Sequence, residues 1–130
     1  DQRALLFADL TALLGEDLLE RALRLLDEWA VITYYTPDRI RQIVELVSKR
    51  NSAQVFRILP GINYCKCRYF QQRVLQLQLE PETEPDRNCV SFTCEHVLAQ
   101  RLHQLFKLAT REQILTLEQF KYFHKDFYAD

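Results

Sequence analysis

The sequence contains no methionine, a single tryptophan, and only six glycine and proline residues among its 130 positions. This scarcity of glycine and proline excludes a collagen-like chain, a flexible linker and wholesale disorder. Uninterrupted apolar runs are far shorter than the roughly 20 residues that a membrane-spanning helix requires. Nothing near the start resembles a signal peptide, so the composition predicts a soluble globular protein. Because methionine is absent, Asp1 is not expected to be the translated start, and targeting stays open.

Length and apolar content are those of one folding unit. Of the 130 residues, 48% are hydrophobic and 27% are charged, which predicts a single domain spanning 1–130. Within it we distinguish a helical N-terminal segment (1–28), a central unit (29–108) and a C-terminal helix (109–130).

Charge is unevenly distributed, although the net charge is only −1. Residues 39–73 hold eight basic side chains against one acidic side chain, a net charge of +7, whereas 1–30 and 74–99 each carry −4. The overall balance argues against a protein that coats nucleic acid by bulk electrostatics. The basic stretch still predicts a local contact with single-stranded DNA, in which cations meet phosphates and an aromatic ring stacks on a base. The candidates are Arg57, Lys66, Arg68, Tyr69 and Arg73; a solvated or partner-facing charge cluster is the alternative.

Hydrophobic spacing predicts helices at both ends of the chain and strands between them. Leucines recur at helical intervals through the first thirty residues, and Gly15 separates two short helices. The β-branched and aromatic residues of 30–36 and the alternation of 53–59 predict strands. The segment 40–48 fits a helix, which periodicity slightly favours, or the middle strand of a three-stranded antiparallel meander. Further helices are predicted over 68–79, 97–108 and 115–127, with an exposed loop at 80–88.

All four cysteines lie between positions 65 and 94, unlike the dispersed cysteines of a disulfide framework. Two close pairs of ligands are typical of a tetrahedral zinc site, because each pair forms a small chelate and the ion joins segments distant in sequence. Sulfur and imidazole nitrogen both suit zinc, so we predict one structural Zn²⁺ held by Cys65, Cys67, Cys94 and His96. Core thiols without metal are the alternative. Cys89 could replace Cys65 or Cys94, whereas His103 lies too far along the predicted helix to join them.

The spacing of these ligands resembles a known motif. Cys65-x-Cys67, a long gap and Cys94-x-His96-x-x-Ala99 match the signature C-x-C…C-x-H-x-x-A of SWIM-type zinc fingers. Over most of residues 20–105 the chain is similar to SWIM-domain subunits of Shu recombination complexes, in the segments RALRLLDEWAVITYY, RQIVEL, QVFRIL, CKCRYFQQRVL and CEHVLAQRL. The resemblance implies a strand at 40–48. The expected fold is therefore α+β, with N-terminal helices, a short three-stranded antiparallel meander, the zinc site and C-terminal helices. Cys89 and the aromatic tail after 115 depart from the family pattern.

The same resemblance implies a function. Such subunits are non-catalytic partners of a RecA-like recombinase paralogue, and the heterodimer promotes assembly of a recombinase filament on single-stranded DNA during homologous recombination repair in the nucleus. The sequence lacks a G-x-x-x-x-G-K-[ST] phosphate loop, and four soft ligands saturate a zinc ion. We therefore expect neither the nucleotide-binding subunit nor an enzyme, and neither a membrane nor a small-molecule substrate as partner.

Two other functions compete with this one. A stand-alone SWIM finger that binds DNA directly, as in transposase-like or transcription-factor chains, should begin the helix after its metal with base-reading polar side chains. This chain instead has Val97, Leu98 and Ala99 there. A ubiquitin-pathway adaptor would carry a second zinc module, which the sequence lacks.

Apolar residues exceed what one small core requires. The first predicted helix presents leucine on more than one side, and aromatic residues crowd the last. Large apolar patches usually mark interfaces in soluble proteins, so we predict an obligate heterodimer with partner contacts at Leu6, Leu10, Leu13, Phe120, Phe123 and Phe127. Ordinary core packing of both sets is the alternative.

Overall fold

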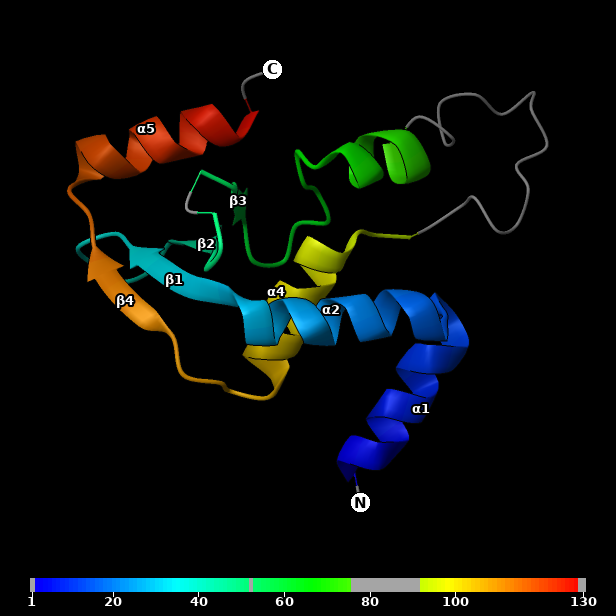
Figure 1. The fold of residues 1–130 in the computed structure, drawn as a ribbon. Coiled ribbons are helices and arrows are strands. Elements are labelled where there is room, and N and C mark those ends of the chain that lie inside the picture. The colour runs from blue at the N-terminus through cyan, green and yellow to red at the C-terminus, as the bar shows by residue number, and fades with distance from the viewer. Residues whose placement is uncertain (1, 52, 76–91, 129–130) are drawn as a thin grey trace.

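The computed structural model describes residues 2–51, 53–75 and 92–128. In chain order its elements are α1 (Gln2–Leu14), α2 (Glu16–Glu28), β1 (Trp29–Tyr35), β2 (Gln42–Ser48), β3 (Val55–Ile58), the π-helix η1 (Phe70–Leu75), α4 (Glu95–Leu105), β4 (Arg111–Ile114) and α5 (Leu117–Tyr128) (Figure 1). The predicted α+β class is confirmed, with five helices and four strands in this part of the chain. No helix among the described residues is long and apolar enough to span a membrane.

The N-terminal segment forms the two predicted helices, which meet at Gly15. Its φ of +88° is a left-handed conformation that glycine adopts without strain. One face of α2 is buried through Leu18, Leu19, Ala22 and Leu25. The second helix is therefore part of the core.

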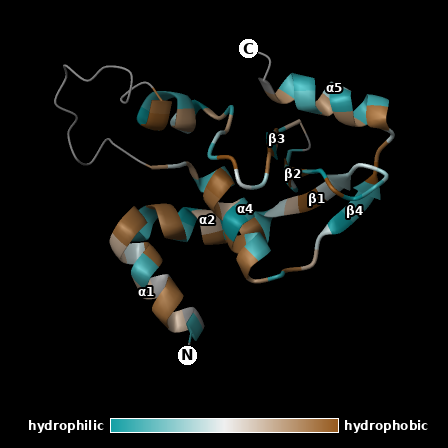
Figure 2. Cartoon of the chain, turned by 180° about the vertical axis from the view of Figure 1, so that it is seen from behind, coloured by the Kyte–Doolittle hydropathy of each residue, from teal (hydrophilic) through white to brown (hydrophobic). Residues whose placement is uncertain are grey.

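Helix α1 extends away from the sheet and is less well covered (Figure 1). Leu10 and Leu14 pack against the core, but Leu5 and Leu13 are 67% and 70% exposed. Hydrophobic positions of α1, which are brown in Figure 2, therefore include exposed side chains.

The sheet has four strands in the order β3-β2-β1-β4. Strands β1, β2 and β3 pair antiparallel, with Thr33 opposite Val44 and Val44 opposite Ile58. The predicted meander is incomplete, because β4 adds a parallel strand to the other edge of β1, where Ile32 lies opposite Arg111. All four residues of β4 are exposed, so it lacks the apolar alternation that identifies a half-buried strand. The described part of the predicted C-terminal helix (109–130) thus contains the strand β4 as well as the helix α5.

Both faces of the sheet are covered by helices. Val44 and Leu46 of β2 belong to the larger core with α2 and α4, whereas Ile43 belongs to the smaller core with α5. Because both faces are covered, the apolar residues of this segment do not alternate with polar ones, and only Glu45 interrupts them. Periodicity cannot distinguish such a strand from a helix. The helix that periodicity slightly favoured for 40–48 is therefore wrong, and the strand implied by the family resemblance is confirmed.

Other boundaries shift by a few residues. The helix predicted over 68–79 is a π-helix at Phe70–Leu75, and that predicted over 97–108 begins at Glu95 and ends at Leu105. The predicted loop 80–88, the positions after Leu75 in the first of these helices, and Cys89 lie outside the described residues.

Candidate metal centre

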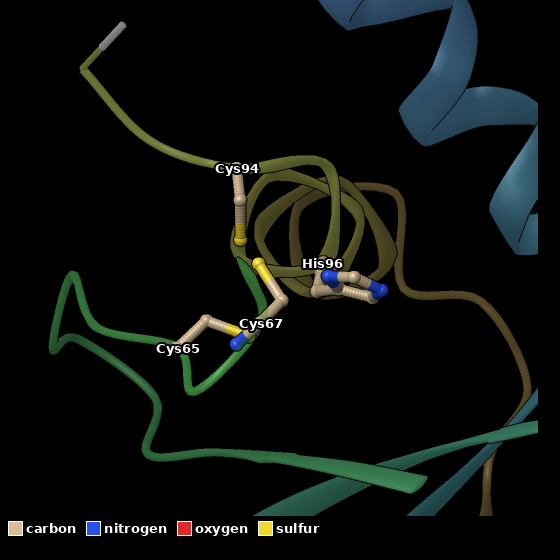
Figure 3. Close-up of side chains that lie close together, drawn as sticks. All are labelled: Cys65, Cys67, Cys94 and His96. Carbon is tan, nitrogen blue, oxygen red and sulfur yellow. The ribbon is translucent and has the colours of Figure 1, made fainter. Parts of the chain in front are cut away.

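Two segments that are distant in sequence supply the four predicted ligands. Cys65 and Cys67 lie on the stretch that connects β3 with η1, while Cys94 caps the start of α4 and His96 lies in its first turn. The four side chains converge on one point between these segments (Figure 3). The sequence-based grouping is confirmed, because this Cys₃His group could hold one metal ion.

The ligand atoms are close together and shielded from water. The three sulfur atoms and one ring nitrogen all lie within 4.8 Å of one another. Cys65 and Cys94 are fully buried, and Cys67 and His96 are 5% and 7% exposed. A tetrahedral site with metal–sulfur bonds of about 2.3 Å has sulfur–sulfur edges of roughly 3.8 Å, so small movements suffice to coordinate an ion.

Backbone amides surround the sulfur atoms. The amide of Cys67 donates to Cys65 Sγ over 3.4 Å, that of Phe70 to Cys67 Sγ over 3.3 Å, and that of Val97 to Cys94 Sγ over 3.5 Å. Such donors favour the thiolate form that a metal ion requires. The Cys94 contact also satisfies an amide in the first turn of α4, which such a helix start otherwise leaves without an acceptor.

The electrostatics of the cluster favour ionisation of one sulfur. Hydrogen bonds with Cys65 and Cys94 lower the pKa of Cys67. Hydrogen bonding to Cys67 and Cys94, together with burial, raises the pKa of Cys65. The pKa of Cys94 is lowered by Cys65 but raised by Cys67 and by burial, and reaches about 12. Three thiolates this close together in a buried site need a cation to balance their charge.

The donor set fits a bound metal in a further respect. Nδ1 of His96 is buried and has no hydrogen-bond partner among the described residues. An unpaired buried ring nitrogen is costly, and coordination is one way to satisfy it. Trp29 and Phe56 pack against this ring, with centroids 5.3 and 4.2 Å away, so aromatic side chains from β1 and β3 enclose the imidazole. The sequence pattern alone does not indicate that these two residues contact the imidazole.

The structure also places the two other cysteine and histidine candidates. His103 lies outside the cluster, as expected, and its Nε2 is 3.0 Å from the carbonyl oxygen of Ala109. Cys89 lies outside the described residues, so its proposed exchange with Cys65 or Cys94 stays a prediction.

The residues predicted to contact DNA do not gather on one free surface. Arg57 binds Glu45 Oε2 over 3.0 Å and Asp126 Oδ2 over 2.7 Å. Nζ of Lys66 donates to the carbonyl oxygen of Asp126. Both basic side chains therefore connect α5 with β3 and with the segment between β3 and η1.

Of the remaining three DNA candidates, Arg68 and Tyr69 directly precede η1 and Arg73 lies within it. The ring of Tyr69 lies 5.0 Å from the guanidinium of Arg21. Arg68 is exposed and Arg73 is half-buried, and neither forms an ion pair with another described residue.

The predicted partner contacts divide into two groups. Phe120 and Phe127 are 4% and 2% exposed within the smaller core. These two residues therefore belong to the ordinary core, which was the alternative to a partner contact. Phe123 is partly buried, with its ring 5.2 Å from that of Tyr34. Leu6 and Leu10 are half-buried, and Leu13 is exposed. Of the six predicted partner contacts, only Leu13 of α1 is exposed.

Fold and site together define a small α+β protein with a buried Cys₃His centre able to hold one metal ion. Comparisons with protein-family models, with curated proteins and with solved structures found no match.

Proposed function

We propose that the centre binds one structural Zn²⁺ ion through Cys65, Cys67, Cys94 and His96. Three sulfur ligands and one imidazole suit the borderline softness of zinc, and four-coordinate Cys₃His sets are typical of its structural sites. Once four protein ligands bind, no position is left for water or substrate. This closed arrangement supports a structural and not a catalytic role.

We further propose that the chain is the non-catalytic SWIM subunit of a Shu-type complex. It would pair with a RecA-like recombinase paralogue in the nucleus and promote recombinase filament assembly on single-stranded DNA during homologous recombination repair. The observation that carries this proposal is the Cys₃His cluster with the C-x-C…C-x-H-x-x-A spacing, buried at the start of α4. The exposed leucines of α1 support the requirement for a partner chain.

The alternative, a stand-alone SWIM finger that binds DNA directly, has less support. A finger of that kind needs the first turns of its helix to enter the major groove. In α4 the side chains of His96, Val97, Leu98, Ala99 and Gln100 are all buried. The first turns of the helix that follows the cysteines therefore pack inside the protein.

The proposed heterodimer leads to a testable prediction about α1. The chain expressed alone should be poorly soluble, and co-expression with the recombinase paralogue should rescue it. Replacing Leu5 and Leu13 with glutamate should weaken the complex by at least about 30-fold, because buried anchor residues typically contribute about 2 kcal/mol or more to binding. Dissociation of the co-expressed, co-purified complexes on dilution measures the change.

An exposed leucine of α5 provides a matched control for this prediction. Leu117→Glu introduces the same change at a leucine of α5 that is 58% exposed, and it should leave affinity unchanged. If the chain is soluble and monodisperse and does not co-elute with the paralogue in size-exclusion chromatography, this result would contradict the heterodimer and favour the stand-alone finger.

A second prediction concerns the basic residues near η1. Reversing the charge of Arg68 and Arg73 to glutamate should weaken binding of single-stranded DNA by the assembled complex and flatten its salt dependence, because phosphate contacts release counterions. Fluorescence anisotropy across a salt series measures both quantities. Unchanged affinity at low salt would show that these cations are only solvated or face the partner.

A further inference from the structure

A polar hollow lies on the α4 side of the sheet, beside the C-terminal half of α4. Its volume is about 210 Å³, and its walls are Thr33, Tyr35, Gln42, Val44, Gln100, His103, Gln104, Lys107, Leu108 and Thr110. Most of these side chains carry hydrogen-bonding groups, and none is acidic. The space between a sheet and a covering helix is normally filled by apolar side chains, so this polar lining is not explained by packing.

One wall of the hollow contains an unsatisfied acceptor. Gln100 is only 3% exposed, and its Nε2 makes a long contact of 3.4 Å to Gln104 Oε1. Its own Oε1 is buried without a hydrogen-bond partner among the described residues. Burying an acceptor in this way destabilises a fold unless a ligand or water supplies the donor.

A second, independent observation comes from the rim of the hollow. The amide of Lys107 bonds to Gln104 O over 3.2 Å and that of Leu108 to His103 O over 3.1 Å, the pattern of a Schellman turn at the end of α4. Lys107 occupies the left-handed position of this turn, with φ of +52°, where glycine is strongly favoured. Strained residues of this kind often belong to functional sites. No described residue forms an ion pair with its ammonium group.

We propose that this hollow holds one unstacked base of single-stranded DNA, with Lys107 on an adjacent phosphate. Glutamine amides offer neutral donors and acceptors, which match the mixed edge of a nucleobase. The absence of acidic side chains from the lining and the single cation at the rim fit a neutral ring attached to an anionic backbone. This inference rests on the proposed function, since it assigns a DNA contact to the same complex.

The test uses the assembled complex and fluorescently labelled single-stranded oligonucleotides. Lys107→Gly removes the cation and relieves the left-handed strain, so this variant should fold at least as well as the wild type. We expect several-fold weaker binding at low salt, and a slope of log affinity against log salt that is shallower by about 0.7, the loss of one phosphate contact. Lys121→Ala removes one exposed cation on α5, outside the hollow, and should leave both quantities unchanged.

A second variant tests the base contact. Gln100→Leu conserves shape and removes the unsatisfied acceptor, so the complex should remain folded. The ratio of affinities for an intact oligonucleotide and its abasic analogue should fall by about fivefold in this variant, in line with the loss of one base contact.

Each outcome decides the question. If the wild-type complex binds single-stranded DNA but both variants keep its salt slope and its abasic ratio, the hollow is not a DNA site and the proposed function survives. If the wild-type complex forms but does not bind single-stranded DNA, the proposed function and this inference both fail.

Discussion

Replacing Cys94 with serine is expected to abolish both metal binding and the native fold. Structural zinc contributes on the order of 10 kcal/mol to folding, whereas a domain of this size has a total stability of about 5–15 kcal/mol. Cys94 is fully buried, lies in the cluster of four ligands and caps α4. Serine is itself a favoured N-cap residue, so the expected loss comes from the missing metal ligand.

Metal analysis and circular dichroism measure the two effects. Purified wild-type protein should contain about one zinc per chain, and the Cys94→Ser variant none. Chelation of the wild-type protein should reproduce the unfolded spectrum of the variant. Cys89→Ser is the control and should keep both metal and fold; loss of zinc from that variant, with retention in Cys94→Ser, would move the site to Cys89.

Replacing Phe127 with alanine should destabilise the metal-loaded protein by about 3–5 kcal/mol, the usual cost of truncating a buried phenylalanine. Phe127 is 2% exposed, and its ring packs edge-on against Tyr64 at 5.3 Å. Tyr64 in turn contacts Phe70 of η1 at 5.7 Å. The substitution thus leaves a cavity between α5 and the segment that follows β3.

Denaturant unfolding at saturating zinc measures this loss. Tyr122 of the same helix is 70% exposed, so Tyr122→Ala is the matched control and should change stability by less than about 0.5 kcal/mol. Equal stability of the two variants would show that α5 does not pack on the sheet in solution, and Phe127 would again be a candidate partner contact.

The metal centre is the part of the protein that the sequence predicts best. The spacing of close pairs such as Cys65-x-Cys67 and Cys94-x-His96 indicates metal chelation in any fold. The strand β4 is different, because Arg111, Glu112 and Gln113 have no apolar pattern. That strand forms because β1 offers an unpaired edge, which is a property of the tertiary structure.

The aromatic C-terminus shows a related limit. Sequence spacing shows that Phe120 and Phe127 belong to an apolar helix face, but it does not show which surface covers that face. In the structure the chain's own sheet does so, through Tyr34 and Ile43. Burial against self and burial against a partner have the same sequence pattern, so only three-dimensional contacts distinguish them.

The hydrogen bonding of Gln100 was equally inaccessible from sequence. A glutamine in a helix is usually solvated. Nothing in the local pattern indicates that this one is buried, with an Oε1 that has no hydrogen-bond donor among the described residues. The same holds for Lys107, whose left-handed backbone is not marked by a glycine in the sequence.

The pairing of β4 with β1 also determines when the sheet can be completed during protein synthesis. Thr110 Oγ1 donates to the carbonyl oxygen of Val31, 79 positions earlier in the chain. At translation rates of ~5–20 residues per second, a ribosome synthesises Thr110 about 4–16 s after Val31. Throughout that interval the outer edge of β1 is open to strands of other nascent chains. Co-translational folding of this protein therefore includes an aggregation-prone stage that ends only when β4 emerges from the exit tunnel.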